Sequence, residues 1–268
     1  GINYHLNVIH FYPSPGSNTR EESSTHADLG DISPRMQWLT INNKTSSRTG
    51  KKDRSSFWVA RSPNSNQMTA RGNVKMKHTD PVKIAFHDPP IVFGETFAGL
   101  LRKNGISVGE VRRVHPGSTS TGDVIFIRNT PLQHALRRSN INSHNLYAES
   151  LLKRIAASAT SRPGTFDEGA SVVESAVIQR LGAYQTGLNV ADGSGMSRQN
   201  KISPKTMAKW LASFGLQDPV GKSLLDSLAT PGHGTLDNRF KNVDLQDATV
   251  HAKSGYLRNV CSLSGYIQ

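Results

Sequence analysis

The first half of the chain carries short apolar runs separated by polar or turn-forming residues, a pattern typical of half-buried strands. We predict strands around Val8–Tyr12, Trp38–Ile41, Phe57–Ala60 and Met68–Met76. The polar segments 17–35 and 43–56 are predicted to be loops. One helix should interrupt this pattern, because Asp88 can cap it and Asn104-Gly105 can end it. Its apolar face would consist of Phe93, Phe97, Leu100 and Leu101.

The hydrophobic period changes after residue 115. Helices are predicted at 131–138 and 146–157, after the capping box formed by Thr165 and Glu168, and from Pro204 onward. Strand character returns at 249–257 and 261–267, which we expect to be neighbouring strands. The segment His115–Gly122 is the predicted boundary. The chain therefore divides into a β-rich region, 1–115, and a second region, 116–268.

Charge changes this picture only slightly. The chain has 268 residues, a formal net charge of +12 and a sequence pI of about 10.0, which suggests a polyanionic partner. The excess is spread evenly, with 16 Lys and Arg against 9 Asp and Glu in residues 1–115, and 16 against 11 in 116–268. Runs of five or six basic residues are absent from the sequence. We therefore expect no nucleic acid as partner, and an acidic cell-wall polymer fits the charge equally well.

Other classes of protein are excluded by simple counts. The sequence holds one cysteine, Cys261, which rules out an internal disulfide framework and a multi-thiolate metal site. No run approaches the roughly 18 consecutive apolar residues of a membrane span. The chain starts at Gly1 without an initiator Met or a leader pattern. We expect it to be part of a longer protein whose signal peptide lies upstream.

Several motifs are weak when taken alone. Gly215–Ser223 resembles a phosphate-binding loop, but five residues instead of four separate its glycines, and it follows a predicted helix. The ten histidines form no zinc-binding pattern, and no Gly-x-Ser-x-Gly elbow is present. We therefore expect no metal and no cofactor. Ser143-His144-Asn145 could simply cap a helix, and Lys253-Ser254-Gly255 could be an edge lysine beside a glycine bulge.

The two triplets gain meaning from their order, about 110 residues apart, and from their flanks. Together they match the Ser-x-Asn and Lys-Thr/Ser-Gly motifs of the penicillin-recognising serine acyl-transferases. The matching segments are SHNLYAESLLKR at 143–154, DGSGMSR at 192–198, GTLDNR at 234–239 and AKSGYL at 252–257. With them the chain resembles D-alanyl-D-alanine carboxypeptidases/endopeptidases of the DacB kind, the class C low-molecular-mass penicillin-binding proteins. The segments 39–45, 58–72 and 88–105 resemble the β-rich insertion of that family.

The resemblance implies an α+β multidomain fold. Residues 1–115 would form the β-rich inserted region. Residues 116–268 would form the C-terminal part of a serine β-lactamase/DD-peptidase-like transpeptidase domain. The chain stops before the last sheet strand and closing helix that this fold leads one to expect.

The implied reaction is acyl transfer at D-Ala-D-Ala ends of peptidoglycan peptides, with β-lactams as ligands of the full-length protein. Ser143 would relay a proton to the leaving amine, and Asn145 would bind the substrate amide and help to hold the catalytic lysine. Lys253 would supply positive charge that tunes Ser143 and attracts the substrate carboxylate.

The strand residues have implied substrate-binding roles. The Ser254 hydroxyl would bind the terminal carboxylate, and Gly255 would let the substrate lie against the strand. The backbone N–H of Tyr256 would form half of the oxyanion hole. His144 stands where the family usually has Asp, and Ser254 replaces the commoner Thr.

The family's nucleophile belongs to a Ser-x-x-Lys motif that precedes the insertion. The only such spacing here, Ser150 to Lys153, lies downstream, so we interpret it as helix surface and expect the nucleophile and its lysine to lie outside this chain. The protein would act in the periplasm or facing the cell wall. An alternative is a non-catalytic peptidoglycan-binding protein with a degenerate transpeptidase domain.

Overall fold

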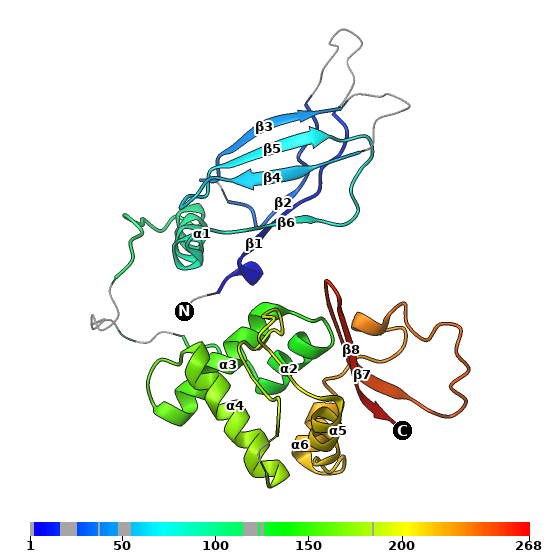
Figure 1. Cartoon of the computed structure of the whole chain (residues 1–268). Helices are drawn as coiled ribbons and strands as arrows, with labels where there is room; N and C mark the ends of the chain where they lie inside the picture. Colours follow the sequence, from blue (N-terminus) through cyan, green and yellow to red (C-terminus); the bar gives the residue numbers. More distant parts are fainter. Residues whose placement is uncertain are drawn as a thin grey trace. The chain divides into compact units, whose positions relative to one another are not determined.

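A computed structural model describes residues 3–16, 26–36, 38–47, 55–114, 123, 126–183 and 185–268. The chain forms two compact units, Gly1–Gly122 and Asp123–Gln268. The first unit is rich in strands and the second in helices (Figure 1). The expected boundary at residues 115 and 116 lies in the segment 115–122, which is outside the described residues.

The first unit contains two three-stranded sheets and one long helix. One sheet has the antiparallel order β2-β1-β6, and in the other β5 lies between β3, which runs parallel to it, and antiparallel β4. The strands are β1 (Val8–Phe11), β2 (Ile32–Ser33), β3 (Ile41–Ser46), β4 (Trp58–Arg61), β5 (Met68–Asn73) and β6 (Val82–Ala85). A 3-10 turn, η1 (His5–Asn7), precedes β1, and α1 (Pro89–Lys103) follows β6.

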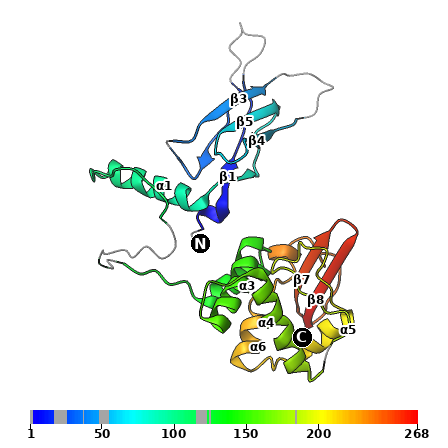
Figure 2. The same ribbon diagram turned by 60° about the vertical axis from the view of Figure 1, so that its left-hand side comes forward.

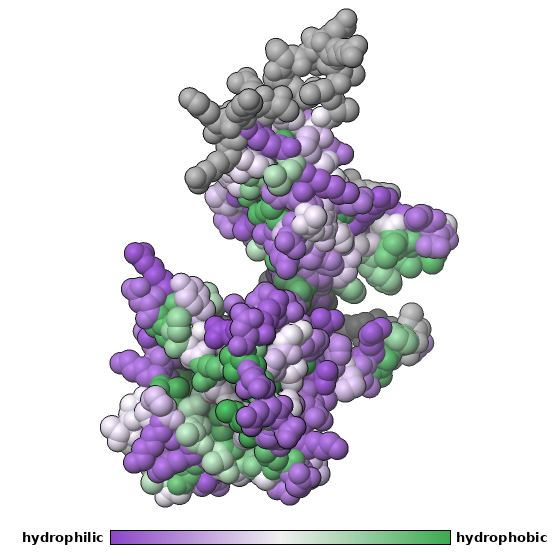
Figure 3. Space-filling model, turned by 90° about the vertical axis from the view of Figure 1, so that its right-hand side faces the viewer, coloured by the Kyte–Doolittle hydropathy of each residue, from purple (hydrophilic) through white to green (hydrophobic). Residues whose placement is uncertain are grey.

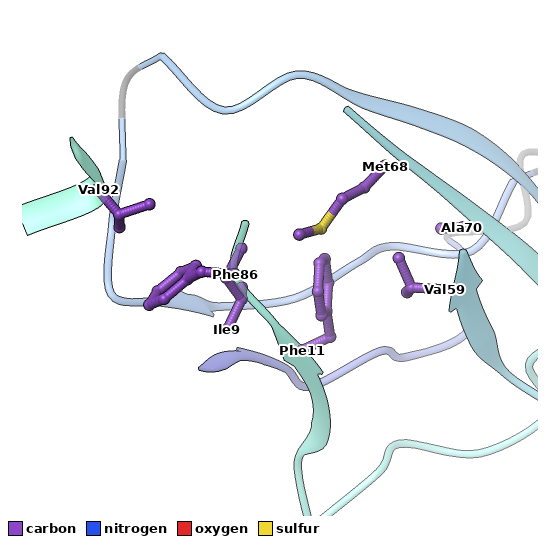
Figure 4. Close-up of a cluster of buried hydrophobic side chains, with 7 residues drawn as sticks. All are labelled: Ile9, Phe11, Val59, Met68, Ala70, Phe86 and Val92. Atoms are coloured by element: carbon purple, nitrogen blue, oxygen red, sulfur yellow. The ribbon is translucent and has the colours of Figure 1, made fainter. Parts of the chain in front are cut away.

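One hydrophobic cluster joins both sheets to α1. The side chains of Ile9 and Phe11 come from β1, and both are fully buried. They pack with residues of β4, β5 and the start of α1 (Figure 4). The other buried members are Val59, Met68, Ala70, Phe86 and Val92. The predicted strands thus supply the core of this unit, because their alternate side chains point to the same side.

Two strands lie in segments that the hydrophobic pattern assigned to loops. β2 falls inside 17–35, and most of β3 falls inside the polar stretch that begins at Asn43. The reason is hydrogen bonding: the Thr45 Oγ1 accepts the N–H of Ala27 at 2.8 Å, and Asn43 Nδ2 donates to the carbonyl of Ala27 at 2.8 Å. Buried polar groups that are paired in this way are tolerated in a sheet, so polarity alone was misleading.

Helix α1 begins at the predicted proline pair but differs from expectation in two ways. Asp88 adopts a left-handed conformation and makes no side-chain cap hydrogen bond; its carboxylate instead accepts from Arg113 at 3.1 Å. The buried side chains of the helix are Val92 and Ala98, whereas Phe93 and Phe97 of the predicted apolar face are exposed in this unit.

The second unit packs helices beside a β-hairpin (Figure 2). Its helices are α2 (Leu132–Asn140), α3 (Asn145–Thr160), α4 (Phe166–Leu181), α5 (Pro204–Ala212) and α6 (Pro219–Leu225), with a 3-10 turn η2 (Gly234–Leu236). The antiparallel strands are β7 (Val250–Leu257) and β8 (Val260–Ile267). The capping box of Thr165 and Glu168 at the start of α4 is confirmed. The phosphate-loop-like segment Gly215–Ser223 follows α5 rather than a strand, and its second half forms the start of α6, a helix that the hydrophobic pattern did not predict.

The surface matches the modest apolar content of the sequence. Hydrophobic residues are interspersed with hydrophilic ones on the side of the molecule shown in Figure 3. In the described part of the chain, no helix combines the length and the apolarity that crossing a bilayer requires.

A small cluster fastens the hairpin to the helices. Leu236 of η2 is fully buried and packs with Ala229, Val250 and Ala252. The main chains of Ala229 and Ala252 exchange two hydrogen bonds, of 2.9 and 3.2 Å. The N–H of Thr235 donates to the carbonyl of Ile141 at 3.0 Å. The η2 turn therefore contacts both β7 and the residues that follow α2.

We predict that Leu236→Ala lowers the free energy of unfolding by about 2–5 kcal/mol, because it removes a fully buried side chain from a tight cluster. Chemical denaturation followed by circular dichroism measures this change. Leu132→Ala on the exposed face of α2 is the matched control and should change stability by less than about 0.5 kcal/mol. Equal effects of the two substitutions would contradict the role of this cluster.

Candidate active site

Ser143 lies in the short connection between α2 and α3. Its φ of 54° is in the left-handed region, which non-glycine residues rarely adopt. The residue that caps α3 is His144, and it makes no side-chain cap hydrogen bond. The simple capping role considered for Ser143 therefore does not describe its position. Such backbone conformations are often found at functional sites.

Lys253 approaches this serine from the middle of β7. Its Nζ donates a hydrogen bond to Ser143 Oγ at 3.0 Å, across 110 positions of sequence. The same ammonium donates to the main-chain carbonyl of Ser254. The structure thus brings together two of the residues that the motifs singled out, within direct hydrogen-bond reach.

Burial changes the chemistry of this lysine. Desolvation lowers the pKa of Lys253 below that of an ordinary lysine. The ammonium therefore holds its proton less tightly, while its hydrogen bonds to Ser143 and Ser254 fix its direction. A cation in this position polarises the serine hydroxyl and attracts an anionic group.

Close main-chain packing holds the connection that carries Ser143. Gly234 has a φ of 62°, and a Cβ at this position would lie 2.5 Å from the carbonyl oxygen of Ile141. Only glycine allows the two backbones to approach so closely. On the other side, Asn140 Nδ2 donates to the buried Ser227 Oγ at 2.8 Å. The end of α2 is therefore fixed to the segments that lead into the hairpin.

The hydrogen-bonding pattern shows which edge of β7 is open. Thr249 bonds to Gln268 on the β8 side, whereas Ala252 directs its N–H and carbonyl to Ala229 on the other side. Main-chain groups alternate along an antiparallel strand, so Ser254 and Tyr256 direct theirs to the same side as Ala252. The N–H of Tyr256 thus points toward the open edge of the hairpin, as an oxyanion-hole donor requires.

Gly255 and Asn145 are the site residues whose expected partners, the substrate and the catalytic lysine, lie outside this chain. A Cβ on Gly255 would lie 2.5 Å from Ser262 Oγ, so this glycine also accommodates packing against β8. Asn145 is the first residue of α3, and its side chain is exposed. The lysine that Asn145 is expected to help hold belongs to the Ser-x-x-Lys motif outside this chain, so this contact stays a prediction.

A further loop, Asp192–Arg198, lies between α4 and α5 in the sequence and contacts α3, where the N–H of Gly193 donates to Glu149 Oε2 at 3.0 Å. The carboxylate of Asp192 accepts the N–H groups of Gly195 and Ser197, both at 2.6 Å. Arg198 Nη2 donates to the carbonyl of Arg258 at 3.1 Å. The sequence marked this loop only as a flank of the motifs, and its Asp-x-x-Gly turn signal could have shown that it is compact.

Ser150 and Lys153, which form the Ser-x-x-Lys spacing within α3, are not arranged as a nucleophile and its base. Ser150 Oγ donates to the carbonyl of Leu146 at 2.7 Å. Lys153 Nζ lies 4.2 Å from the centroid of the Phe166 ring. Both side chains are on the helix surface, as predicted. Among the described residues there is also no group of three or more His, Cys, Asp or Glu side chains that could hold a metal ion.

Comparison with known proteins identifies the family of the chain. Residues 17–268 match the D-Ala-D-Ala carboxypeptidase 3 (S13) family. Carboxypeptidase DacB of Mycolicibacterium smegmatis is 28% identical over 184 residues, which cover 67% of this chain and 39% of that protein. A D-alanyl-D-alanine carboxypeptidase of Actinomadura sp. is 32% identical over 189 residues, which cover 67% of this chain and 34% of that protein. The chain thus spans little more than a third of these relatives.

The fold is also that of a solved protein. Penicillin-binding protein 4 (DacB) from Haemophilus influenzae, crystallised with a β-lactam, superposes with a TM-score of 0.73 at 22% identity. The match covers 98% of this chain and 60% of that one. The expected α+β fold of the penicillin-binding proteins is confirmed. With the family match over residues 17–268 and the motif order, this establishes that the chain belongs to the D-Ala-D-Ala carboxypeptidase 3 (S13) family.

Proposed function

We propose that this chain is part of a serine-type D-Ala-D-Ala carboxypeptidase/endopeptidase that acts on peptidoglycan peptides through an acyl-enzyme. The hydrogen bond of 3.0 Å between Lys253 and Ser143 carries the proposal, because it joins the two motifs of this chemistry. The named relatives support it. The full-length protein would bind β-lactams and act in the periplasm or facing the cell wall, and the first unit would be the family's β-rich insertion.

The reaction begins with a serine hydroxyl supplied from outside this chain. Its oxygen bonds to the carbonyl carbon of the penultimate D-Ala, and the peptide C–N bond then breaks. The proton of that serine passes to the lysine of the same Ser-x-x-Lys motif, and Ser143 relays it from this lysine to the nitrogen of the departing D-Ala, since its hydroxyl can both accept and donate. The N–H of Tyr256 stabilises the charge on the carbonyl oxygen. Water then hydrolyses the acyl-enzyme.

Binding of the substrate uses the open edge of β7. The peptide adds alongside this strand, where the main-chain groups of Ser254 and Tyr256 are directed outward. The ammonium of Lys253 attracts the terminal carboxylate, and the hydroxyl of Ser254 donates to it. The Asn145 side chain, which is exposed at the start of α3, would contact the substrate amide.

We predict that this chain by itself forms no covalent adduct with a fluorescent penicillin on a denaturing gel, whereas the full-length protein does. Ser150 donates to a helix carbonyl and has no base, so it cannot act as nucleophile. Labelling of this chain that disappears in Ser150→Ala or Ser143→Ala would show that the nucleophile is wrongly assigned. A full-length protein that stays unlabelled would favour the non-catalytic wall-binding alternative.

In the full-length protein, Ser143→Ala should lower the rate of acylation by about 10²–10⁴-fold, the usual contribution of a positioned proton carrier. Stopped-flow measurements with a chromogenic β-lactam give this rate. The matched control is Ser150→Ala, a serine-to-alanine change on the same stretch of chain, which should leave acylation unchanged. A loss of less than about threefold on Ser143→Ala would rule out the relay.

The lowered pKa of Lys253 predicts the position of the alkaline limb of activity. The reaction needs the ammonium, which is present below the folded-state pKa and lost as pH rises through it. Activity should therefore decline at a lower pH than an ordinary lysine would give. Lys253→Arg keeps the charge to higher pH and should move this limb upward. The pH profiles of kcat/KM for the wild type and for Lys253→Arg check this. If the alkaline limb does not move in the variant, it reports the titration of another group.

A further inference from the structure

The sheet formed by β3, β5 and β4 has two chemically different faces. One face contributes Val59, Met68 and Ala70 to the core of the first unit. The intervening residues lie on the opposite face because side chains alternate along a strand. In the observed register they form two rows, Lys44–Arg71–Trp58 and Asn42–Thr69–Ala60. All are exposed except Thr69, which is half-buried.

Trp58 gives this face a large aromatic surface. Its side chain is 52% exposed although it belongs to a strand whose next residue, Val59, is buried. The guanidinium carbon of Arg71 lies 5.8 Å from the centroid of the Trp58 ring. A cation beside the ring limits its rotation, so the exposed part of the indole is held in one orientation.

The charges on this face are unbalanced. Lys44 and Arg71 are direct neighbours on adjacent strands, and like charges in this arrangement destabilise a sheet. The two rows contain no acidic residue, and no ion pair involves either cation among the residues that the structure describes. A bound anion would relieve this repulsion, so the pair of cations favours an anionic ligand.

We propose that this face binds cell-wall glycan strands from which the stem peptides have been removed, because cleavage of the amide bond to the peptide frees the carboxylate of the sugar. The apolar C–H face of one pyranose ring stacks on Trp58, and the carboxylate of a neighbouring sugar lies between Lys44 and Arg71. Asn42 and Thr69 in the second row offer hydrogen bonds to hydroxyl and acetamido groups. The identity of the polymer rests on the proposed function, while the aromatic and charge pattern does not.

The same pattern argues against a nucleic acid as the ligand. Platforms for single-stranded nucleic acids stack successive bases on several aromatic side chains along a basic groove. Besides the two cations, the two rows hold a single aromatic residue and two short polar side chains, Asn42 and Thr69. One ring and two short hydrogen-bonding groups suit a sugar, which presents one apolar face and many hydroxyl groups.

The test measures binding of this chain to peptide-free glycan strands prepared from amidase-treated peptidoglycan, by co-sedimentation and calorimetry. Trp58→Ala should weaken binding at least tenfold, and Trp58→Phe, which keeps a ring, should lose less. Lys44→Gln combined with Arg71→Gln should also weaken binding at least tenfold and should reduce its dependence on salt. Circular dichroism checks that each variant is folded. If Trp58→Ala does not fold, the binding of Trp58→Phe is compared with that of the wild type instead.

Matched controls come from the same unit. Phe97 is also 52% exposed, so Phe97→Ala removes an equally exposed ring, and Lys103→Gln removes an exposed charge from α1. Both should bind glycan like the wild type. The proposal is overturned if the wild type does not bind, if Trp58→Ala binds within twofold of it, or if a (dT)20 oligonucleotide binds more tightly than the glycan. Because the strands carry no peptide, glycan binding without penicillin labelling would refute only the peptidase function.

Discussion

The contact between the η2 turn and the end of α2 is the constraint on which the candidate active site depends. The backbone of Gly234 lies directly against the carbonyl of Ile141, where any side chain would collide. Leu236, two residues later, is buried against Ala252 and the other residues of its cluster. Ser143 comes two residues after Ile141, and Lys253 follows Ala252. One short turn therefore sets the separation between a helix connection and a strand that are far apart in sequence.

The electrostatic character of the site follows from this placement. Lys253 is partly buried on β7, and desolvation lowers its pKa. The loss of hydration is offset by the hydrogen bonds to Ser143 and to the Ser254 carbonyl. The same strand pairs with β8 on one edge and keeps the Tyr256 N–H directed to the other. The Lys253 ammonium, the Ser143 hydroxyl and the Tyr256 N–H are thus positioned by one strand and its neighbours.

The two units differ in where the polar side chains of their helices and strands lie. In the second unit, the polar motif residues lie at a helix start and along an open strand edge, where a substrate could reach them. In the first unit, Asn43 and Thr45 are turned inward and paired with the main chain of Ala27. Lys44, Arg71 and Trp58 lie on the opposite face of that sheet. Each unit thus carries a polar surface of its own, and the two surfaces differ in character.

The sequence by itself determined α2, α3, α4 and α5 of the second unit, the final hairpin and the family, because these depend on local periodicity, capping residues and ordered motifs. It did not predict α6. It also identified Ser143 and Lys253, but only through resemblance, since neither triplet is distinctive alone. Tertiary structure decided the rest. β2 and most of β3 were taken for loops, because long-range hydrogen bonds, which leave no hydrophobic pattern, make a polar strand stable. The roles of Gly234 and Asp88 were equally hidden, since a backbone collision and a distant arginine are set by which segments meet in space rather than by neighbours along the chain.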